Sequence, residues 1–365
     1  IHNHIFGVSK KLNVLVFGCG NVGGTLIDQI QDTEDGILER RNLRINIFGV
    51  ANSKKALLDN HGIGRGWRAD FDAHAQPYSI DSLIEYIEQH NLENVVVVDN
   101  TASADFVRNY PRFVSAGYDI VASNKVGNTI SYDFYASLRR LLKQKGKTFL
   151  YETNVGAGLP LVDTIRQLHH SGDKIRRIRG VFSGTLSYIF NHFSEEDKDF
   201  YTILREAMER GYTEPDPRED LCGNDVARKL LILAREIDLK SEFSDIAIEN
   251  LIPESLRTGS VEDFLSSGDY LNEYYAARKA SLAPDEVLRY VGDLDAVTGT
   301  LEVKLAKVKK GTALGSLKGS DSMFEIYTES YGENPLVIQG AGAGAQVTAR
   351  GVYTDILRLS EAVYA

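Results

Sequence analysis

Residues 12–24, LNVLVFGCGNVGG, decide how the first part of this chain folds. The apolar run 12–17 is typical of a buried strand, and it passes directly into a G-x-G-x-x-G motif. In this motif Gly18 permits a tight turn, Gly20 lets the backbone approach a pyrophosphate, and Gly23 lets a helix pack closely on the strand. The motif alone is weakly specific, but its place between a strand and a helix predicts a dinucleotide site.

Helices and strands alternate after the motif. Leu26, Ile27 and Ile30 recur at helical spacing, so a helix should begin here and point its first amides at the phosphates. Residues 79–90 form another amphipathic helix, and the β-branched run 95–98 is typical of a central parallel strand. This order predicts an α/β fold with a parallel sheet.

The end of the second predicted strand, residues 44–50, bears on the choice of dinucleotide. NAD-specific sites usually carry Asp or Glu there to hold the ribose 2′-hydroxyl. Here residues 51–55 read ANSKK, without a carboxylate. We therefore expect NADP as the preferred cofactor and NAD as the alternative. Lys54 and Lys55 could instead simply begin a solvated helix.

Two further strand ends supply polar side chains. The run 95–98 is followed by DNTAS at 99–103, and a strand at 119–122 is followed by SNK at 123–125. Ligands of such sheets bind at the carboxyl ends of the strands. Thr101, Ser103 and Lys125 are therefore candidate contacts, although lysine is also common as a plain surface residue.

A glycine-containing turn, ETNVGAGLP at 152–160, follows a strand at 148–151. Its glycines leave backbone carbonyls free to converge, and Glu152 adds a carboxylate beside them. Hard monovalent or divalent cations favour such oxygen ligands. A tight turn without a metal ion explains the same residues equally well.

The stretch 211–236, GYTEPDPREDLCGNDVARKLLILARE, joins an acidic segment to a helix that should be largely buried. Asp225 and Lys229 lie one turn apart beside its apolar face, where an ammonium group is costly unless a partner or a task keeps it there. Pro215 and Pro217 forbid a helix upstream, so a loop should carry Glu214 and Asp220. An ordinary solvated charge cluster is the alternative.

The rest of the chain mixes helices and strands, which predicts an α+β domain. Strands are expected at 176–182, 287–291 and 300–308, and helices through Phe106 and Phe113, through Tyr188 and Phe193, and at 132–145. Ser194 with Asp197 resembles a capping box for the following helix, which ends at Gly211. The segment QGAGAGA at 339–345 should open a helix to about Leu359, either as a second phosphate-type site or as a close helix contact on the first domain.

Composition narrows the classes of protein. A chain of 365 residues is expected to form two domains, and its net charge of -10 argues against a nucleic-acid surface. The sequence has no apolar run long enough to cross a bilayer and no signal-peptide pattern. Cys19 and Cys222 belong to no paired-cysteine motif. We therefore expect a cytoplasmic protein without a membrane partner.

Taken together, these motifs resemble homoserine dehydrogenase. The resemblance runs in order through GCGNVGG, DNTAS, ASNKVGN, ETNVGAGLP, GVFSGTLSYIFN, GYTEPDPREDLCGNDVARK and GAGAGAQVTARGVYTD. It implies reduction of L-aspartate 4-semialdehyde to L-homoserine with NADPH or NADH, on the route to threonine and methionine. It also implies a Rossmann domain at 1–150, completed by the C-terminal helix 340–362, and an α+β catalytic and dimerisation domain at 151–339.

The resemblance also implies residue roles. Glu214 and Asp225 resemble the residues that hold the amino group of the substrate, and Asp220 matches a further acidic residue. Lys229 and Lys125 resemble the two active-site lysines, with Lys229 assigned proton transfer. The implied sets are Lys229, Lys125, Asp225 and Asp220 for catalysis, and Glu214, Asp225 and Lys125 for substrate.

Cofactor and cation contacts follow in the same way. The cofactor set is Gly18, Gly20, Asn21, Val22, Gly23, Ala51, Thr101, Ser103, Lys125, Gly211, Gly340 and Gly342. Glu152, with the carbonyls of Val155, Ala157 and Leu159, matches a site for sodium or another monovalent cation.

The ends of the chain bear on its partners. The opening IHNHIFGVSKKLNV resembles the linker of bifunctional aspartokinase and homoserine dehydrogenase chains. We therefore expect an excised C-terminal half, with any threonine feedback located in the missing portion. The family resemblance separately implies a homodimer.

Two rival functions remain at this stage. In an aldehyde oxidation of the semialdehyde or glyceraldehyde-phosphate type, Cys222 would be the nucleophile, but the acidic residues around it disfavour a thiolate. A nucleotide sensor without catalysis would explain the glycine motif and leave Asp225 and Lys229 without a role.

Overall fold

The computed structural model describes residues 10–363, so the opening nine residues of the linker-like segment lie outside the described chain. Two compact units emerge: the first contains residues up to Gly158 and from Gly344 onward, and the second contains Leu159–Ala343. Each unit has its own sheet.

The first unit is built on a seven-stranded sheet with strand order β4-β3-β2-β1-β5-β6-β7. The strands from β2 to β7 in that order are parallel, and β3 and β4 add an antiparallel edge. The elements are β1 (Lys10–Phe17), α2 (Asn21–Arg41), β2 (Leu43–Ala51), β3 (Lys55–Leu58), α3 (Trp67–His74), β4 (Gln76–Pro77), α4 (Ile80–Gln89), β5 (Val95–Asp99), α5 (Ala104–Val107), α6 (Tyr110–Ser115), β6 (Asp119–Ala122), α7 (Val126–Thr129), α8 (Tyr132–Lys145), β7 (Phe149–Leu150), a 3-10 turn (Glu152–Asn154) and α17 (Ala345–Val363). This is the predicted Rossmann-like α/β fold.

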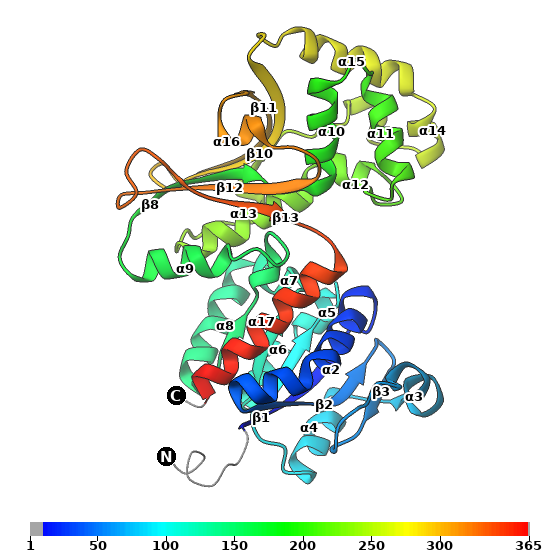
Figure 1. Cartoon of the computed structure of the whole chain (residues 1–365), viewed down its shortest axis with the longest axis vertical. Helices are drawn as coiled ribbons and strands as arrows, with labels where there is room; N and C mark the ends of the chain where they lie inside the picture. Colours follow the sequence, from blue (N-terminus) through cyan, green and yellow to red (C-terminus); the bar gives the residue numbers. More distant parts are fainter. Residues whose placement is uncertain (1–9, 364–365) are drawn as a thin grey trace. The chain divides into compact units, whose positions relative to one another are not determined.

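Alternate residues of β1 pack into two different cores. Leu12, Val14 and Val16 face a core shared with α2 and α17, whereas Leu15 and Phe17 face a core shared with α4 and α6. Figure 1 shows α17 lying beside α2 on one face of this sheet. The prediction that the C-terminal helix packs on the first domain is confirmed.

The second unit is built on a six-stranded sheet with strand order β13-β12-β8-β10-β11-β9. Its pairs are antiparallel except for β9 beside β11. The elements are α9 (Val162–His170), β8 (Ile175–Val181), α10 (Gly184–Glu195), α11 (Phe200–Glu209), α12 (Arg218–Leu221), α13 (Asn224–Glu236), β9 (Ala247–Ile248), α14 (Val261–Leu265), α15 (Gly268–Ala280), β10 (Glu286–Asp295), β11 (Thr300–Lys309), α16 (Ala313–Ser316), β12 (Asp321–Thr328) and β13 (Leu336–Ala341), with 3-10 turns at Phe243–Asp245 and Glu254–Leu256. Both α10 and α13 contact β10.

Two predictions of local structure, in the first part and around α11, were wrong, and one alternative is excluded. The helix through Phe106 and Phe113 is broken into α5 and α6, because Pro111 has no amide donor and its ring would clash with a continuous helix. Asp199 caps α11 by accepting from the Thr202 amide, whereas Ser194 lies inside α10. Lys55 begins strand β3, so Lys54 and Lys55 do not open a helix.

Two further predictions need correction in the second unit. Asp220 lies in the one-turn helix α12 rather than on a loop, because Pro217 occupies the position before the first turn, where a missing amide costs nothing. Residues 339–341 complete strand β13, so the glycine-rich segment is strand first and turn only from 342 onward, and the helix starts at Ala345.

Candidate functional site

The turn between β1 and α2 leaves no room for side chains at two of its glycines. Gly18 has φ +83°, and a Cβ atom there would lie 2.8 Å from the Asn100 carbonyl. A Cβ atom at Gly23 would lie 1.7 Å from the Gly18 oxygen. Around Gly20, by contrast, a Cβ atom would meet nothing within 4 Å. The turn therefore presents bare backbone to open space, as a pyrophosphate requires.

The N-terminus of α2 is suited to an anion. Gly20 caps the helix without a side-chain acceptor, so the amides of Asn21, Val22 and Gly23 are not capped by the residue before them. Beside the turn, the Nδ2 atom of Asn100 is buried and donates no hydrogen bond within the described chain. These donors fit a dinucleotide with its phosphates at this turn.

A buried carboxylate organises the neighbouring strand ends. Asp99, fully buried at the end of β5, accepts from the Thr101 amide at 2.8 Å and the Tyr110 hydroxyl at 2.6 Å. Asn124 donates to the same carboxylate at 2.9 Å and to the Ser103 carbonyl at 3.2 Å. Burial raises the pKa of Asp99. Thr101 and Ser103 are thus fixed at the same sheet edge as the turn.

Ala51 and Lys125 complete this edge. The Ala51 carbonyl accepts from the Gly18 amide at 2.8 Å, which ties the end of β2 to the glycine turn. Lys125 follows β6 directly, and its carbonyl accepts from the Asn128 amide in the first turn of α7. The structure therefore brings nine of the predicted cofactor residues to one edge of one sheet: Gly18, Gly20, Asn21, Val22, Gly23, Ala51, Thr101, Ser103 and Lys125.

The predicted cation ligands lie in a turn that packs on α17. The buried residue Glu152 donates its amide to Asp355 at 2.9 Å, and the Arg358 guanidinium lies 3.9 Å from its carboxylate. Ala157 has φ +50°, so the turn is tightly wound, as both sequence interpretations require. Val155 and Ala157 belong to the first unit, but Leu159 opens the second, where its carbonyl accepts from the Leu161 amide at 2.9 Å.

In the second unit, Lys229 is turned inward from α13. Its ammonium group donates to the Phe182 carbonyl at 3.0 Å and lies 2.8 Å from the Asp225 carboxylate. The Lys229 side chain is 13% exposed and that of Asp225 is 45% exposed. The predicted buried helix is confirmed, and the structure adds an i, i+4 ion pair between Asp225 and Lys229.

Asp225 lines an acidic cavity of about 390 Å³. The lining residues are Ser183, Glu214, Glu219, Asp220, Cys222, Asn224, Asp225, Val226 and Arg228. The lining therefore contains four carboxylates and one guanidinium. Lys229 does not line the cavity itself, but it contacts the lining residue Asp225. Such a lining suits a ligand with a positively charged group.

The surroundings of Asp220 in this lining alter its pKa. It accepts from the Glu214 amide at 2.8 Å. Burial raises the pKa of Asp220, and the nearby carboxylates of Glu214 and Asp225 raise it further. Sequence reasoning missed Ser183 and Asn224 as lining residues, although Ser183 lies at a strand end and Asn224 directly precedes Asp225.

The remaining predicted cofactor glycines lie in the second unit. Gly211 has φ +71° and follows α11, where it permits the helix to end. A Cβ atom at Gly340 would lie 2.9 Å from Leu159, and one at Gly342 would lie 2.0 Å from the Ser322 hydroxyl. Close packing within the unit therefore accounts for the last two glycines.

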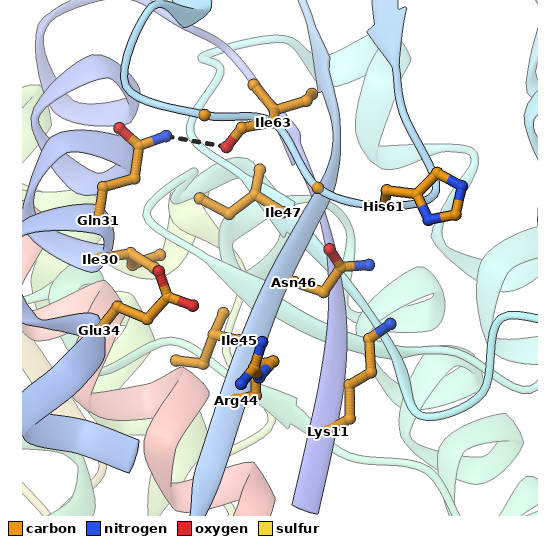
Figure 2. A pocket seen from close by; sticks show the side chains of 12 residues that line it. Lys11, Ile30, Gln31, Glu34, Arg44, Ile45, Asn46, Ile47, His61 and Ile63 are labelled. Atoms are coloured by element: carbon orange, nitrogen blue, oxygen red, sulfur yellow. Dashed lines mark hydrogen bonds between the residues drawn. The ribbon is translucent and has the colours of Figure 1, made fainter. Parts of the chain in front are cut away.

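A different cavity of the first unit lies at the opposite edge of its sheet. It measures about 280 Å³ and is lined by residues at the beginnings of β1 and β2, including Lys11 and Arg44. Figure 2 shows Gln31 of α2 donating to the Ile63 carbonyl beside it. Because the glycine turn follows the other end of β1, this cavity is not part of the cofactor edge.

Two features are absent from the part of the chain that the structure describes. Across 10–363, no helix combines the length and the apolar character that crossing a bilayer would take. The same residues contain no group of three or more His, Cys, Asp or Glu side chains placed to hold a metal ion.

Family models match both parts of the chain. Residues 18–152 match the NAD binding domain of homoserine dehydrogenase, and residues 160–357 match the homoserine dehydrogenase family itself. The NAD(P)-binding character of the first part is thereby established.

Curated relatives match the chain over almost its whole length. A bifunctional aspartokinase/homoserine dehydrogenase 1 of Zea mays, named as chloroplastic, is 40% identical over 98% of this chain and 39% of its own length. A bifunctional aspartokinase/homoserine dehydrogenase 2 of Escherichia coli is 36% identical over 99% of this chain and 45% of its own length. The chain thus spans less than half of the curated relatives that it matches.

Solved structures share the fold. A Candida auris protein of unknown function superposes with a TM-score of 0.89 at 34% identity, covering 97% of this chain and 99% of that one. A hyperthermophilic archaeal homoserine dehydrogenase in complex with NADPH has a TM-score of 0.73 at 22% identity, covering 96% of this chain and 98% of that one.

Proposed function

The chain belongs to the homoserine dehydrogenase family, and on that premise we propose that it reduces L-aspartate 4-semialdehyde to L-homoserine with NADPH or NADH. The observation that carries this proposal is the acidic cavity beside the Lys229–Asp225 pair. Its carboxylates suit the ammonium group of an amino-acid substrate, which an apolar pocket could not bind.

Lys229 is proposed as the proton donor. A lysine ammonium has three N–H donors, of which two are taken up by Asp225 and the Phe182 carbonyl. The third can protonate the aldehyde oxygen as it gains negative charge. Bound NADPH or NADH supplies the hydride that the aldehyde carbon receives. Asp225 holds the ammonium group of Lys229 in position. Because Asp225 lines the cavity, its carboxylate also contacts the substrate there.

The remaining roles follow from the cavity and the motifs. We propose that Glu214 and Asp225 hold the substrate's ammonium group and that Asp220 adds negative charge to the same cavity. Lys125 is proposed to bind the substrate and the cofactor. The glycines Gly211, Gly340 and Gly342 are proposed to contact the cofactor, as the motif positions imply.

We also propose a preferred cofactor, a cation, partners and a location for the protein. We propose a preference for NADP because Lys54 and Lys55 follow β2, and a sodium or other monovalent cation at Glu152 and the carbonyls of Val155, Ala157 and Leu159. A homodimer and an aspartokinase part of the full-length protein are proposed from the family. We propose the cytoplasm as its location, whereas the plant relatives are named as chloroplastic.

The decisive test is a direct assay. Purified protein is mixed with L-homoserine and NADP, and the absorbance of the reduced cofactor is followed. The proposal expects the absorbance of the reduced cofactor to rise in a mixture that contains no phosphate or acyl acceptor. Absence of this rise with both NADP and NAD, in protein whose circular dichroism shows it folded, would overturn it.

A cysteine-dependent oxidation is the second candidate, because Cys222 lines the cavity. In that reaction the thiolate attacks the aldehyde, but the surrounding carboxylates oppose formation of a thiolate. Cys222→Ser should therefore retain the homoserine activity. Loss of activity in Cys222→Ser, with unchanged activity in Cys19→Ser, would favour the cysteine mechanism instead.

A further inference from the structure

The Arg68 guanidinium lies over the first turn of α2. A Cβ atom at Gly24 would lie 3.1 Å from its Nη2 atom and 3.7 Å from the Cys19 carbonyl. Gly24 directly follows the motif whose backbone faces open space at Gly20. A cation from α3 is therefore held beside the turn that we assign to the dinucleotide.

Two hydrogen bonds to one carboxylate fix this cation, and a third holds the carboxylate itself. Asp28, one turn after Gly24 on α2, accepts from Arg68 Nη1 at 2.9 Å and Nη2 at 2.7 Å. The Trp67 indole donates to the same carboxylate at 3.1 Å, and the guanidinium carbon lies 4.4 Å from the centre of the Trp67 ring. The hydrogen bonds from Arg68 hold the pKa of Asp28 below its usual value. Arg68 is thus positioned before any ligand arrives.

The guanidinium still has donors to offer. It carries five N–H groups, and Asp28 accepts two of them. The side chain is 58% exposed, so the others can reach a ligand. Arginine suits phosphate because its planar fork can bond a carboxylate on one side and a phosphate on the other.

The topology decides which half of the dinucleotide Arg68 meets. α3 packs on β3, and β3 begins at Lys55, directly after the turn that follows β2. In the sheet, β2 and β3 lie on one side of β1, and β5 lies on the other. The adenosine ribose of a dinucleotide lies at the end of β2. Arg68 therefore flanks the adenosine side of the turn, as Lys54 and Lys55 do.

We propose that Arg68, held by Asp28 and Trp67, is a specificity-determining residue that contacts the 2′-phosphate of NADP. This inference rests on the NADP preference proposed above. It adds Arg68 of α3 to Lys54 and Lys55, which follow β2. Asp28 acts as a positioning residue, since it touches the guanidinium and not the phosphate. NADH has no 2′-phosphate, so its binding does not depend on Arg68.

The test measures NADPH and NADH binding by isothermal titration calorimetry in wild type and in Arg68→Ala. The expected result is a loss of about tenfold or more in NADPH affinity, the usual size of a charge-assisted hydrogen bond, with NADH affinity within about twofold of wild type. Arg68→Lys keeps the charge without the fork and should lose less. Asp28→Asn should also weaken NADPH more than NADH.

The chain offers a matched control one turn further along α2. Arg65 pairs with Asp32 at 2.7 Å and is 73% exposed, and Asp32 lies four residues beyond Asp28. Arg65→Ala should leave both affinities unchanged. Equal losses of NADPH and NADH in Arg68→Ala, or no loss in either, would overturn the assignment to the 2′-phosphate. A wild-type protein that binds neither dinucleotide would overturn the cofactor proposal and this inference together.

Discussion

The glycine turn of the first unit and the acidic cavity of the second are built by different means. At the turn the site consists of backbone atoms. Side chains are excluded at Gly18 and Gly23, because a Cβ atom there would lie 2.8 Å and 1.7 Å from its nearest neighbour. In the second unit the site consists of side chains, because four carboxylates line a cavity of about 390 Å³. The turn is therefore sensitive to added atoms, whereas the cavity is sensitive to changed charge.

The largest expected effect comes from the cavity side. Lys229→Ala removes the group that we assign to proton donation, together with its ion pair to Asp225. Turnover should fall about a hundredfold or more, the usual size of general-acid catalysis. The measurement is kcat for homoserine oxidation, with the exposed Lys240→Ala as the control. A kcat near wild type in Lys229→Ala would remove Lys229 from the mechanism.

The next effect separates binding from folding at the turn. Gly20→Ala should leave the thermal unfolding midpoint unchanged, because a Cβ atom there meets nothing within 4 Å. It should lower NADPH affinity about tenfold or more, because the methyl group occupies the space that a pyrophosphate needs.

Gly23→Ala is the companion variant. Its Cβ atom would overlap the Gly18 oxygen, so the turn must shift, and the free energy of unfolding should fall by about 1–3 kcal/mol. Urea titration of both variants checks this contrast. Equal stability losses at Gly20 and Gly23 would contradict the distinction between open and filled positions.

The smallest effect concerns charge in the cavity. The pKa of Asp220 is raised in the folded protein above the value of about 3.9 expected in the unfolded chain. The stability that Asp220 contributes is therefore present below the pKa of the unfolded chain and is lost as pH rises through the folded pKa. Asp220→Asn removes this loss, so its stability relative to wild type should improve as pH rises from about 4 toward neutrality.

Substrate binding should show the opposite trend. Deprotonation of Asp220 strengthens the attraction for an ammonium group, so the wild-type KM for homoserine should fall over the same pH range, and Asp220→Asn should flatten that fall a few-fold. The two profiles are measured by urea titration and by initial rates. A KM profile unchanged by Asp220→Asn would show that this carboxylate does not face the substrate.

Parts of both regions could be predicted from the sequence. The glycine turn follows from local constraints, since the positive φ of Gly18 and the close approach at Gly23 are needed wherever this motif joins a strand to a helix. The buried helix α13 was equally accessible, because its apolar residues recur at helical spacing.

What the sequence could not predict depended on contacts between distant residues. Arg68 and Asp28 are forty positions apart, and no periodicity links them. Ser183 reaches the cavity from the turn before α10, while most other lining residues belong to one continuous stretch. The roles of Glu214, Asp220 and Lys125 came from the family resemblance, because charge patterns alone also fit a solvated surface.

The return of α17 to the first unit has a consequence for synthesis. Domains usually fold in order as they leave the ribosome, beginning at the N-terminus. Here Ala349, Val352 and Ile356 complete a core that Leu12 and Val14 begin, and the entire second unit is translated between them. One face of the first sheet therefore stays incompletely covered until α17 emerges from the ribosome. The first unit begins to form before the second unit but is completed after it.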